Sequence, residues 1–394
     1  MPLDGATVQI TLVRRSDEID DRLWQACFPA PLEGRFWYRT LETSNLESQF
    51  EFAYGVITAR GQPIGIAPCF VHNVPMSLVA PPVAAFFFNT ASRVFPSAGY
   101  QRTLFLGSPC ADEGTVGLVP GVALAEVVDE LGAFALATAK SFDAPLVVWK
   151  DFAEHDLPAL QRLTQAGGFF TIPSYPGTKA TLPGKTKEDY FQALSSSHRH
   201  NLRKKLRRSR ETIELETSVI AQPSDRELGE IFGLFLQTFE KGKTKFERLD
   251  RTFFERVRSL EPVRFILQRE KATGELVTFM MVLRIGNRLI NKFIGLDYRR
   301  AGKSYLYFRL FEAALEHAYA TGATELQSGQ TGYRAKIDLG HALVPLFNVS
   351  RHCNPLVNFA YRQIARGVSW KTLDSDLANY LRAHPDAESG THGK

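Results

Sequence analysis

Cysteine is scarce in this sequence, with only four residues in 394 positions. The cysteines are widely scattered and form no C-x-x-C pair, so their spacing excludes a disulfide framework and a zinc ribbon. The histidine pair His198-x-His200 has no carboxylate or thiol at ligand spacing beside it. We therefore expect neither a metal ion nor a disulfide, and we predict a reducing cytoplasm as the location. The cysteines are Cys27, Cys69, Cys110 and Cys353.

Long uninterrupted apolar runs are also missing. The most apolar stretches lie at residues 78–88 and 116–139. The first is too short to cross a bilayer, and the second is broken by proline, glutamate and aspartate. The N-terminus carries acidic residues and an early proline instead of a long apolar core. We expect neither a transmembrane segment nor a signal peptide.

Two common catalytic motifs are absent. No G-x-S-x-G element is present, which excludes the nucleophile turn of a serine hydrolase. The stretch Gly302-Lys303-Ser304 has the end of a phosphate-binding P-loop, but Asp297 occupies the position of the required first glycine. The sequence therefore does not predict a P-loop nucleotidase.

Positive charge is concentrated in one segment. The formal net charge is +5, yet Ser195–Arg210 alone holds seven Lys and Arg residues and no acid. On a helix these cations form a stripe that is suited to phosphate groups or, alternatively, simply faces solvent. No helix-turn-helix, zinc finger or heptad pattern accompanies them, so we do not expect DNA recognition. The candidate phosphate-binding residues are Arg199, Asn201, Arg203 and Lys204.

The length of the chain and its hydrophobic pattern predict two α/β domains with mixed sheets. Each half runs strand, helix, hairpin, helix, strand. The proline- and glycine-rich residues 172–186 are the predicted linker. We place the domains at residues 1–180 and 181–382, and we expect a disordered tail at residues 383–394.

The second domain contains the stretch that concerns function most. Two strands meet at Gly286-Asn287, as in a hairpin, and the basic segment RRAGKS follows at residues 299–304. A helix is predicted over residues 305–322 and a strand over residues 323–329. A glycine-bearing turn before a helix presents main-chain N–H groups to an anion, so we expect this turn to hold a phosphate-bearing ligand.

These residues resemble the GNAT acyltransferase superfamily, and more narrowly its tandem FemAB-like or BioF2-like branch. Arg299, Gly302 and Ser304 occupy the places of the family's Arg/Gln-x-x-Gly-x-Gly/Ala loop, with serine as the last small residue. The segment TGYRAKIDLG is similar to the Tyr-x-x-Lys…Gly element of this branch, with Tyr333 and Lys336 in place. SHRHNLRKKLRR is similar to its basic helix.

The resemblance implies two tandem GNAT-like domains, with the donor site in the second. It also implies an acyl-CoA donor, such as acetyl-CoA, bound by the basic turn, and direct attack by an amine without a covalent enzyme intermediate. Tyr333 is the candidate acid, because a phenol in a dry site can protonate a leaving thiolate. The expected catalytic residues are Tyr333, Gln327 and Lys336, and the expected donor contacts are Arg299, Arg300, Gly302, Lys303 and Ser304.

Three functions remain open from the sequence. The first is an acyltransferase that modifies an amine of a small molecule or of a cell-envelope or polysaccharide precursor. The second keeps the fold but takes aminoacyl-tRNA as donor, with the basic helix on RNA. The third is a non-catalytic protein that binds polyanions through the same helix on a degenerate GNAT fold.

Overall fold

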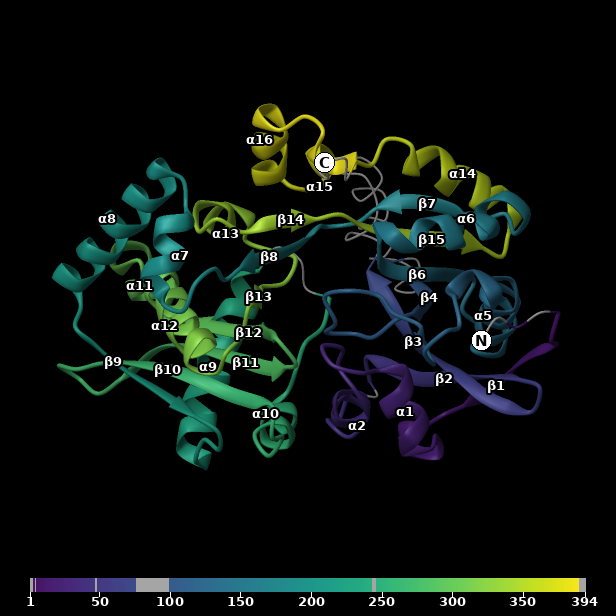
Figure 1. Ribbon diagram of the computed structural model, residues 1–394, viewed down its shortest axis with the longest axis horizontal. Helices are drawn as coiled ribbons and strands as arrows, with labels where there is room; N and C mark the ends of the chain where they lie inside the picture. Colours follow the sequence, from purple (N-terminus) through teal and green to yellow (C-terminus); the bar gives the residue numbers. More distant parts are fainter. Residues whose placement is uncertain (1–2, 4, 47, 76–98, 243–245, 390–394) are drawn as a thin grey trace.

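The computed structural model describes residues 3, 5–46, 48–75, 99–242 and 246–389. It contains two mixed sheets flanked by helices, which confirms the predicted fold class. The two sheets lie side by side, and the C-terminal helices α14–α16 lie along one edge of both (Figure 1).

The first sheet has the strand order β1-β2-β3-β4-β6-β15-β7, with β5 paired to β3. All neighbours are antiparallel except β4 and β6. Its strands are β1 (Val8–Val13), β2 (Phe50–Ala59), β3 (Gln62–Pro75), β4 (Tyr100–Leu106), β5 (Gly117–Leu118), β6 (Leu146–Ala153), β7 (Phe170–Pro173) and β15 (Leu346–His352). Its helices are α1 (Asp21–Cys27), α2 (Arg35–Glu42), α5 (Val128–Ser141) and α6 (Leu157–Ala166).

The second sheet has the order β14-β8-β13-β12-β11-β10-β9. Its strands are β8 (Gly177–Thr181), β9 (Leu215–Ile220), β10 (Val263–Glu270), β11 (Leu276–Ile285), β12 (Arg288–Leu296), β13 (Glu325–Gln327) and β14 (Ala342–Val344). Its helices are α7 (Lys187–Ala193), α8 (Ser196–Thr212), α9 (Asp225–Lys241), α10 (Arg251–Val257), α11 (Tyr298–Ser304), α12 (Leu306–Ala320) and α13 (Tyr333–Asp338).

The chain crosses between the sheets twice. The first crossing joins Pro173 of β7 to Gly177 of β8, and the second joins Val344 of β14 to Leu346 of β15. The Ser174 N–H donates to the Leu346 carbonyl at 2.8 Å, so the two crossings lie side by side. The last strand of the second half of the chain therefore completes the first sheet.

The predicted linker at residues 172–186 is wrong in part. Its first residues end β7, and its middle forms β8, which pairs with both β13 and β14. Pairing partners far along the chain make a strand of a segment whose local composition indicates a loop. The domain boundaries at residues 180 and 382 stay a prediction, and β15 lies with the first sheet across them.

Two predictions made from short sequence motifs are confirmed: a hairpin turn and a helix start. Gly286 has a φ of 59° and joins β11 to β12 as the predicted hairpin. Helix α9 begins at a capping box in which Ser224 and Glu227 each bond the other's main-chain N–H. Both devices satisfy main-chain groups at the end of an element.

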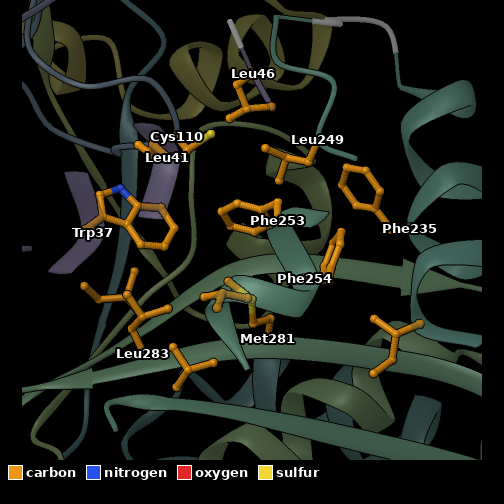
Figure 2. Close-up of a cluster of buried hydrophobic side chains, with 14 of the residues drawn as sticks. Trp37, Leu41, Leu46, Cys110, Phe235, Leu249, Phe253, Phe254, Met281 and Leu283 are labelled. Carbon is orange, nitrogen blue, oxygen red and sulfur yellow. The ribbon is translucent and has the colours of Figure 1, made fainter. Parts of the chain in front are cut away.

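One hydrophobic core joins the two halves (Figure 2). Trp37 of α2 meets Phe253 of α10 edge to face, with ring centroids 5.9 Å apart. Neither side chain is exposed, and the cluster continues to Met281 on β11. Burial of each large side chain contributes about 1.5–3 kcal/mol. The two sheets therefore share a dry interface that fixes their relative position.

The C-terminal helices are α14 (Pro355–Ala365), α15 (Trp370–Leu373) and α16 (Ser375–Ala383), and a 3-10 turn follows at Ala387–Ser389. Within the segment predicted as a disordered tail, Glu388 accepts a hydrogen bond of 2.8 Å from the Trp370 N–H, and residues 390–394 lie outside the described residues. In the described ranges, no helix combines the length and the apolar character that a membrane span needs.

Candidate active site

The strands β12 and β13 are parallel and separate after a short pairing. They pair only from Arg288 with Glu325 to Ile290 with Gln327. Beyond this point β12 continues to Leu296 and is paired with β11 alone. The edge of β12 that faces away from β11 is therefore unpaired over its second half. We call this place the β12/β13 opening.

A β-bulge distorts β12 at the opening. Asn291 pairs with Val282 and Phe293 pairs with Met281, so Lys292 is left without an opposite residue on β11. A bulge takes the extra residue out of the regular ladder and re-aims its main chain and side chain, and it is frequent beside active sites. The bulge lies next to the last paired residue of the opening.

The side chain of Lys292 is buried at the interface of the two halves. Its ammonium forms an ion pair with Glu33, donates to the Cys110 carbonyl at 2.9 Å and lies 5.0 Å from the Trp37 ring centroid. Burial acts to lower the pKa of Lys292, but Glu33 and Asp112 raise it above its ordinary value. Lys292 is therefore a fixed cation that binds the first half of the chain to the bulge.

Lys336 of α13 is a second buried lysine at the same interface, with 7% of its surface exposed. Its Nζ donates to the Gly329 carbonyl at 3.0 Å. Burial lowers the pKa of Lys336 to about 7, and Asp112 opposes this only in part. A large fraction of this amine is therefore uncharged at neutral pH.

Gln327 and Asp112 link the opening to the first half of the chain. The Gln327 amide donates to Asp112 Oδ2 at 2.9 Å, and a Cβ built on Gly329 would lie 3.7 Å from Asp112 Oδ1 and 3.9 Å from Lys336 Nζ. Ser328 lies 3.3 Å from His341 Nε2. The structure thus brings the predicted residues Gln327 and Lys336 together around Asp112.

Two buried carbonyl oxygens at the opening have no hydrogen-bond donor. They are Asn291 Oδ1 on β12 and Gln327 Oε1 on β13, and both lack a partner in the described part of the chain. Buried polar atoms are nearly always paired, so each of these oxygens needs a donor. Gln327 is paired with Ile290 and not with Asn291, so the two side chains lie on opposite faces of the sheet, and Gln327 is the one that faces Asp112.

Tyr333 does not fit the acid role predicted for it. Its hydroxyl donates to the Pro176 carbonyl at 2.9 Å, and its ring packs against Trp370 and Leu377 of the C-terminal helices. Burial raises the pKa of Tyr333 well above its usual value. The side chain anchors α13 to the C-terminal helices instead of facing the opening.

The basic turn is helical, and its first main-chain amides are occupied. The Arg299 N–H donates to the Asp297 carboxylate at 3.0 Å, and the Arg300 and Ala301 N–H groups donate to the Asp297 carbonyl. The expectation that these amides are free for an anion is therefore wrong. Asp297 caps a short helix, α11, because its carboxylate satisfies the first amide.

The arginines of the turn are also paired. Both guanidinium groups bond the Asp297 carboxylate, and Arg300 reaches Glu275 as well. The hydrogen bond from the Arg299 side chain lowers the pKa of Asp297. A phosphate at this corner would have to compete with these acids for the charge of Arg299 and Arg300.

The end of the turn remains open. A Cβ built on Gly302 would meet no atom within 4 Å. Ser304 is buried, and Tyr305, with a φ of 48°, begins α12 without any side-chain cap. The side chain of Lys303 lies outside the described part of the structure. Among the described residues, no side chain caps the first turn of α12 beside Gly302.

The basic helix α8 lies at the outer side of the second half (Figure 1). Arg199 bonds the carbonyls at the end of α7, and Arg203 forms an ion pair with Glu188. Asn201 and Lys204 are exposed. A shallow hollow of about 260 Å³ runs along this face and is lined by Ser196, Arg199, His200, Arg203, Lys204 and Arg207.

Several residues of the site that we did not predict have weak signals in the sequence. Asn291 and Lys292 interrupt an otherwise apolar strand, and Asp112 lies in the acidic pair of the segment CADEG between apolar stretches. A buried lysine or acid within such a segment requires a partner. The pattern shows that a partner exists but not where it lies.

A family model described as the acetyltransferase (GNAT) domain matches residues 196–336. Among solved structures, FemX has a TM-score of 0.56 at 13% identity, and the match covers 89% of this chain and 99% of FemX. Residues 196–336 thus match a GNAT domain, and the chain as a whole shares the fold of FemX, in agreement with the resemblance read from the sequence.

Two further structures share the fold. A tandem GNAT protein from the clavulanic acid biosynthesis pathway, solved without AcCoA, has a TM-score of 0.51 at 12% identity, with 89% of this chain and 99% of that chain covered. A conserved protein of unknown function from Bacteroides thetaiotaomicron has a TM-score of 0.50 at 12% identity, with 87% and 99% covered. No curated protein matches the sequence. These likenesses establish the fold and leave donor and acceptor to the chemistry of the site.

The pKa of Lys336 predicts a pH-dependent stability. The unfolded chain has a normal lysine near 10.4, so between pH 7 and pH 10 it binds a proton that the folded chain has lost. The free energy of unfolding of wild type relative to Lys336→Met should therefore rise with pH over this range, by up to about 1.4 kcal/mol per unit, and stay level below pH 7. Urea denaturation at several pH values measures it.

The matched control is Lys140→Met, which removes an exposed lysine of α5. Its stability relative to wild type should not change with pH in the same way. If Lys336→Met and Lys140→Met show the same pH dependence, Lys336 titrates as an ordinary lysine and the assignment of a neutral amine is wrong.

Proposed function

We propose that this protein transfers an acyl group from a CoA thioester to a primary amine at the β12/β13 opening. The observation that carries the proposal is the buried lysine, Lys336, whose pKa falls to about 7, beside Asp112 and Gln327, where Gln327 Oε1 is a buried acceptor without a partner in the described part of the chain. An amine can donate to Gln327 Oε1, and Lys336 can take a proton that the amine must lose.

The reaction is a direct displacement. The substrate ammonium first loses one proton to solvent, and the neutral amine attacks the thioester carbonyl while the uncharged Lys336 Nζ accepts its second proton. The carbon–sulfur bond breaks as the amide forms, and the Lys336 ammonium gives that proton to the leaving thiolate. Lysine therefore acts first as base and then as acid, and no covalent enzyme intermediate forms.

The bulge at Lys292 supplies the second part of the mechanism. Negative charge develops on the carbonyl oxygen as the amine attacks, and a main-chain N–H outside the ladder is a suitable donor to it. The ammonium of Lys292 is fixed by Glu33 and the Cys110 carbonyl, so the bulge is rigid before the substrate arrives. A preorganised donor costs no rearrangement during the reaction.

The donor phosphates belong at the corner of Gly302. The Asp297 carboxylate and carbonyl take the first amides of α11, which leaves the first turn of α12 as the positive end of a helix. Gly302 allows close approach there, because nothing lies within 4 Å of its Cβ position. The tandem GNAT protein from the clavulanic acid pathway is described as being without AcCoA, which names this thioester in connection with that protein and supports a CoA thioester as donor here.

A second donor, aminoacyl-tRNA, is favoured by a separate observation. The hollow along α8 is lined by four Arg and Lys side chains, and α8 packs against α11 and α12. An RNA whose phosphates bind there could extend toward the turn beside Gly302. Arg299 and Arg300 would keep their bonds to Asp297 and Glu275. The structural likeness to FemX is compatible with this donor as much as with CoA.

Gly302→Leu should weaken the binding of acetyl-CoA by at least about tenfold, because the new side chain fills the corner where the phosphates approach. The helix itself favours leucine over glycine, so the fold is retained. Isothermal titration with acetyl-CoA measures the effect. Gly229→Leu in α9 is the matched control, since Gly229 is also helical, exposed and free of neighbours within 4 Å. Equal Kd values for both variants would remove the donor from this corner.

Lys336→Met should lower kcat by about 10²-fold or more and leave the Kd of acetyl-CoA unchanged, because the lysine acts on the proton and not on the phosphates. Release of free CoA in the presence of a panel of primary amines gives the rate, and Lys140→Met should match wild type. Undiminished turnover in Lys336→Met would contradict the assigned base. A protein that turns over neither donor would instead be a binding protein on this fold.

The tRNA alternative predicts RNA binding with a steep salt dependence. Lys204→Glu should weaken binding and reduce the slope of log K against log salt by about one. Arg226→Glu is the control, because Arg226 is a highly exposed arginine on α9, outside the α8 hollow. Filter binding with uncharged tRNA measures both. Binding that is insensitive to salt, or equally weakened in both variants, would count against RNA as the donor.

A further inference from the structure

Helix α14 exposes an unusual amount of apolar surface. Across the described residues five large hydrophobic side chains are well exposed, and three of them lie on α14: Leu356 at 81%, Phe359 at 64% and Ile364 at 42%. Single exposed apolar residues are normal, whereas a cluster on one element marks an interaction site.

These side chains form a continuous stripe along one face. Leu356, Phe359, Ala360, Gln363 and Ile364 follow the spacing of one side of an α-helix, and all five are exposed. This face is the one that points away from the protein.

The opposite face holds α14 firmly on the first sheet. The Asn358 amide donates to the Gly168 carbonyl at 2.9 Å, Arg362 donates to the Phe169 carbonyl at 2.9 Å, and Ala365 is buried. The helix is therefore docked in one orientation, and its apolar stripe is a stable feature of the surface.

The segment of the chain that carries the stripe has basic side chains and no acidic ones. Residues 339–373 contain no aspartate or glutamate, while they include Arg351, Arg362, Arg366 and Lys371. Of these, Arg366 and Lys371 are exposed beside the end of α14. A protruding apolar stripe with cations on its flank is the arrangement that binds an anionic lipid surface, where the apolar side chains enter the acyl boundary and the cations meet the headgroups.

We propose that α14 docks this protein on the surface of an anionic lipid bilayer, with Leu356, Phe359 and Ile364 inserted and Arg366 and Lys371 at the headgroups. The charge favours lipid over a protein partner, because the stripe offers no acidic group to complete a mixed-charge interface. The helix lies flat on the surface and is too short to cross it, at eleven residues. The proposal is independent of the acyl donor and acceptor.

The test measures binding of the full chain to vesicles of phosphatidylcholine with one quarter phosphatidylglycerol, and to phosphatidylcholine alone. We expect binding to the anionic vesicles that weakens with salt. Leu356→Gln/Phe359→Gln should weaken it by at least about tenfold. Arg366→Glu/Lys371→Glu should weaken it by about tenfold or more and remove the preference for anionic lipid. Val219→Gln on β9 is the control, since Val219 is exposed at 41% outside α14.

A second measurement uses a natural probe. Cys353 directly precedes α14 and is exposed, whereas Cys27, Cys69 and Cys110 are buried. A polarity-sensitive thiol dye on Cys353 should shift to shorter emission wavelength on addition of anionic vesicles, and the shift should be lost in Leu356→Gln/Phe359→Gln. This readout does not depend on catalysis.

Three results would overturn the proposal. One is the absence of vesicle binding and of any dye shift at millimolar lipid. Another is binding that Leu356→Gln/Phe359→Gln leaves unchanged or that Val219→Gln weakens as much. The third is self-association in sedimentation experiments that Leu356→Gln/Phe359→Gln abolishes without any vesicle binding, which would make α14 a contact between copies of this chain.

Discussion

The buried ion pair of Lys292 and Glu33 is the interaction on which the interface and the site both depend. Lys292 occupies the bulge of β12, while Glu33 lies in the loop before α2 of the other half. Loss of one partner of such a pair leaves an uncompensated buried charge, at a cost of about 3–5 kcal/mol. The pair also holds the bulge against the Cys110 carbonyl. The same contact thus fixes the two halves and shapes the strand that borders the opening.

Two lysines at one interface reach opposite charge states because their partners differ. Lys292 has a carboxylate in direct contact, so its pKa is raised although it is buried. Lys336 has only a carbonyl as a direct partner and Asp112 at a distance, so burial decides and its pKa falls to about 7. One amine serves as a structural cation and the other is available for proton transfer. The two lysines differ in charge because Lys292 has the Glu33 carboxylate in direct contact, whereas the direct partner of Lys336 is the Gly329 carbonyl.

Local sequence signals predicted the elements around the site but not the contacts between them. The hairpin at Gly286 and the capping box at Ser224 depend on neighbouring residues, and both are confirmed. The main-chain amides of the turn before α12 were predicted to be free for an anion, yet the Asp297 carboxylate accepts a hydrogen bond from the first of them. This hydrogen bond is local, but the family's loop pattern does not include the position of Asp297. Tyr333 was predicted at the site, but its partners Pro176 and Trp370 are remote in sequence. Such pairings, like that of β15 with β6, are set by the whole fold.

Helix α14 is another element whose contacts could not be predicted from the sequence. Its apolar residues have the spacing of a core-facing stripe, and a sequence pattern cannot tell which face a helix buries. Here the polar side chains Asn358, Tyr361 and Arg362 find partners on the first sheet and turn the apolar stripe outward. These hydrogen bonds fix which face of α14 meets the first sheet, and among the described residues nothing covers the apolar stripe on the other face.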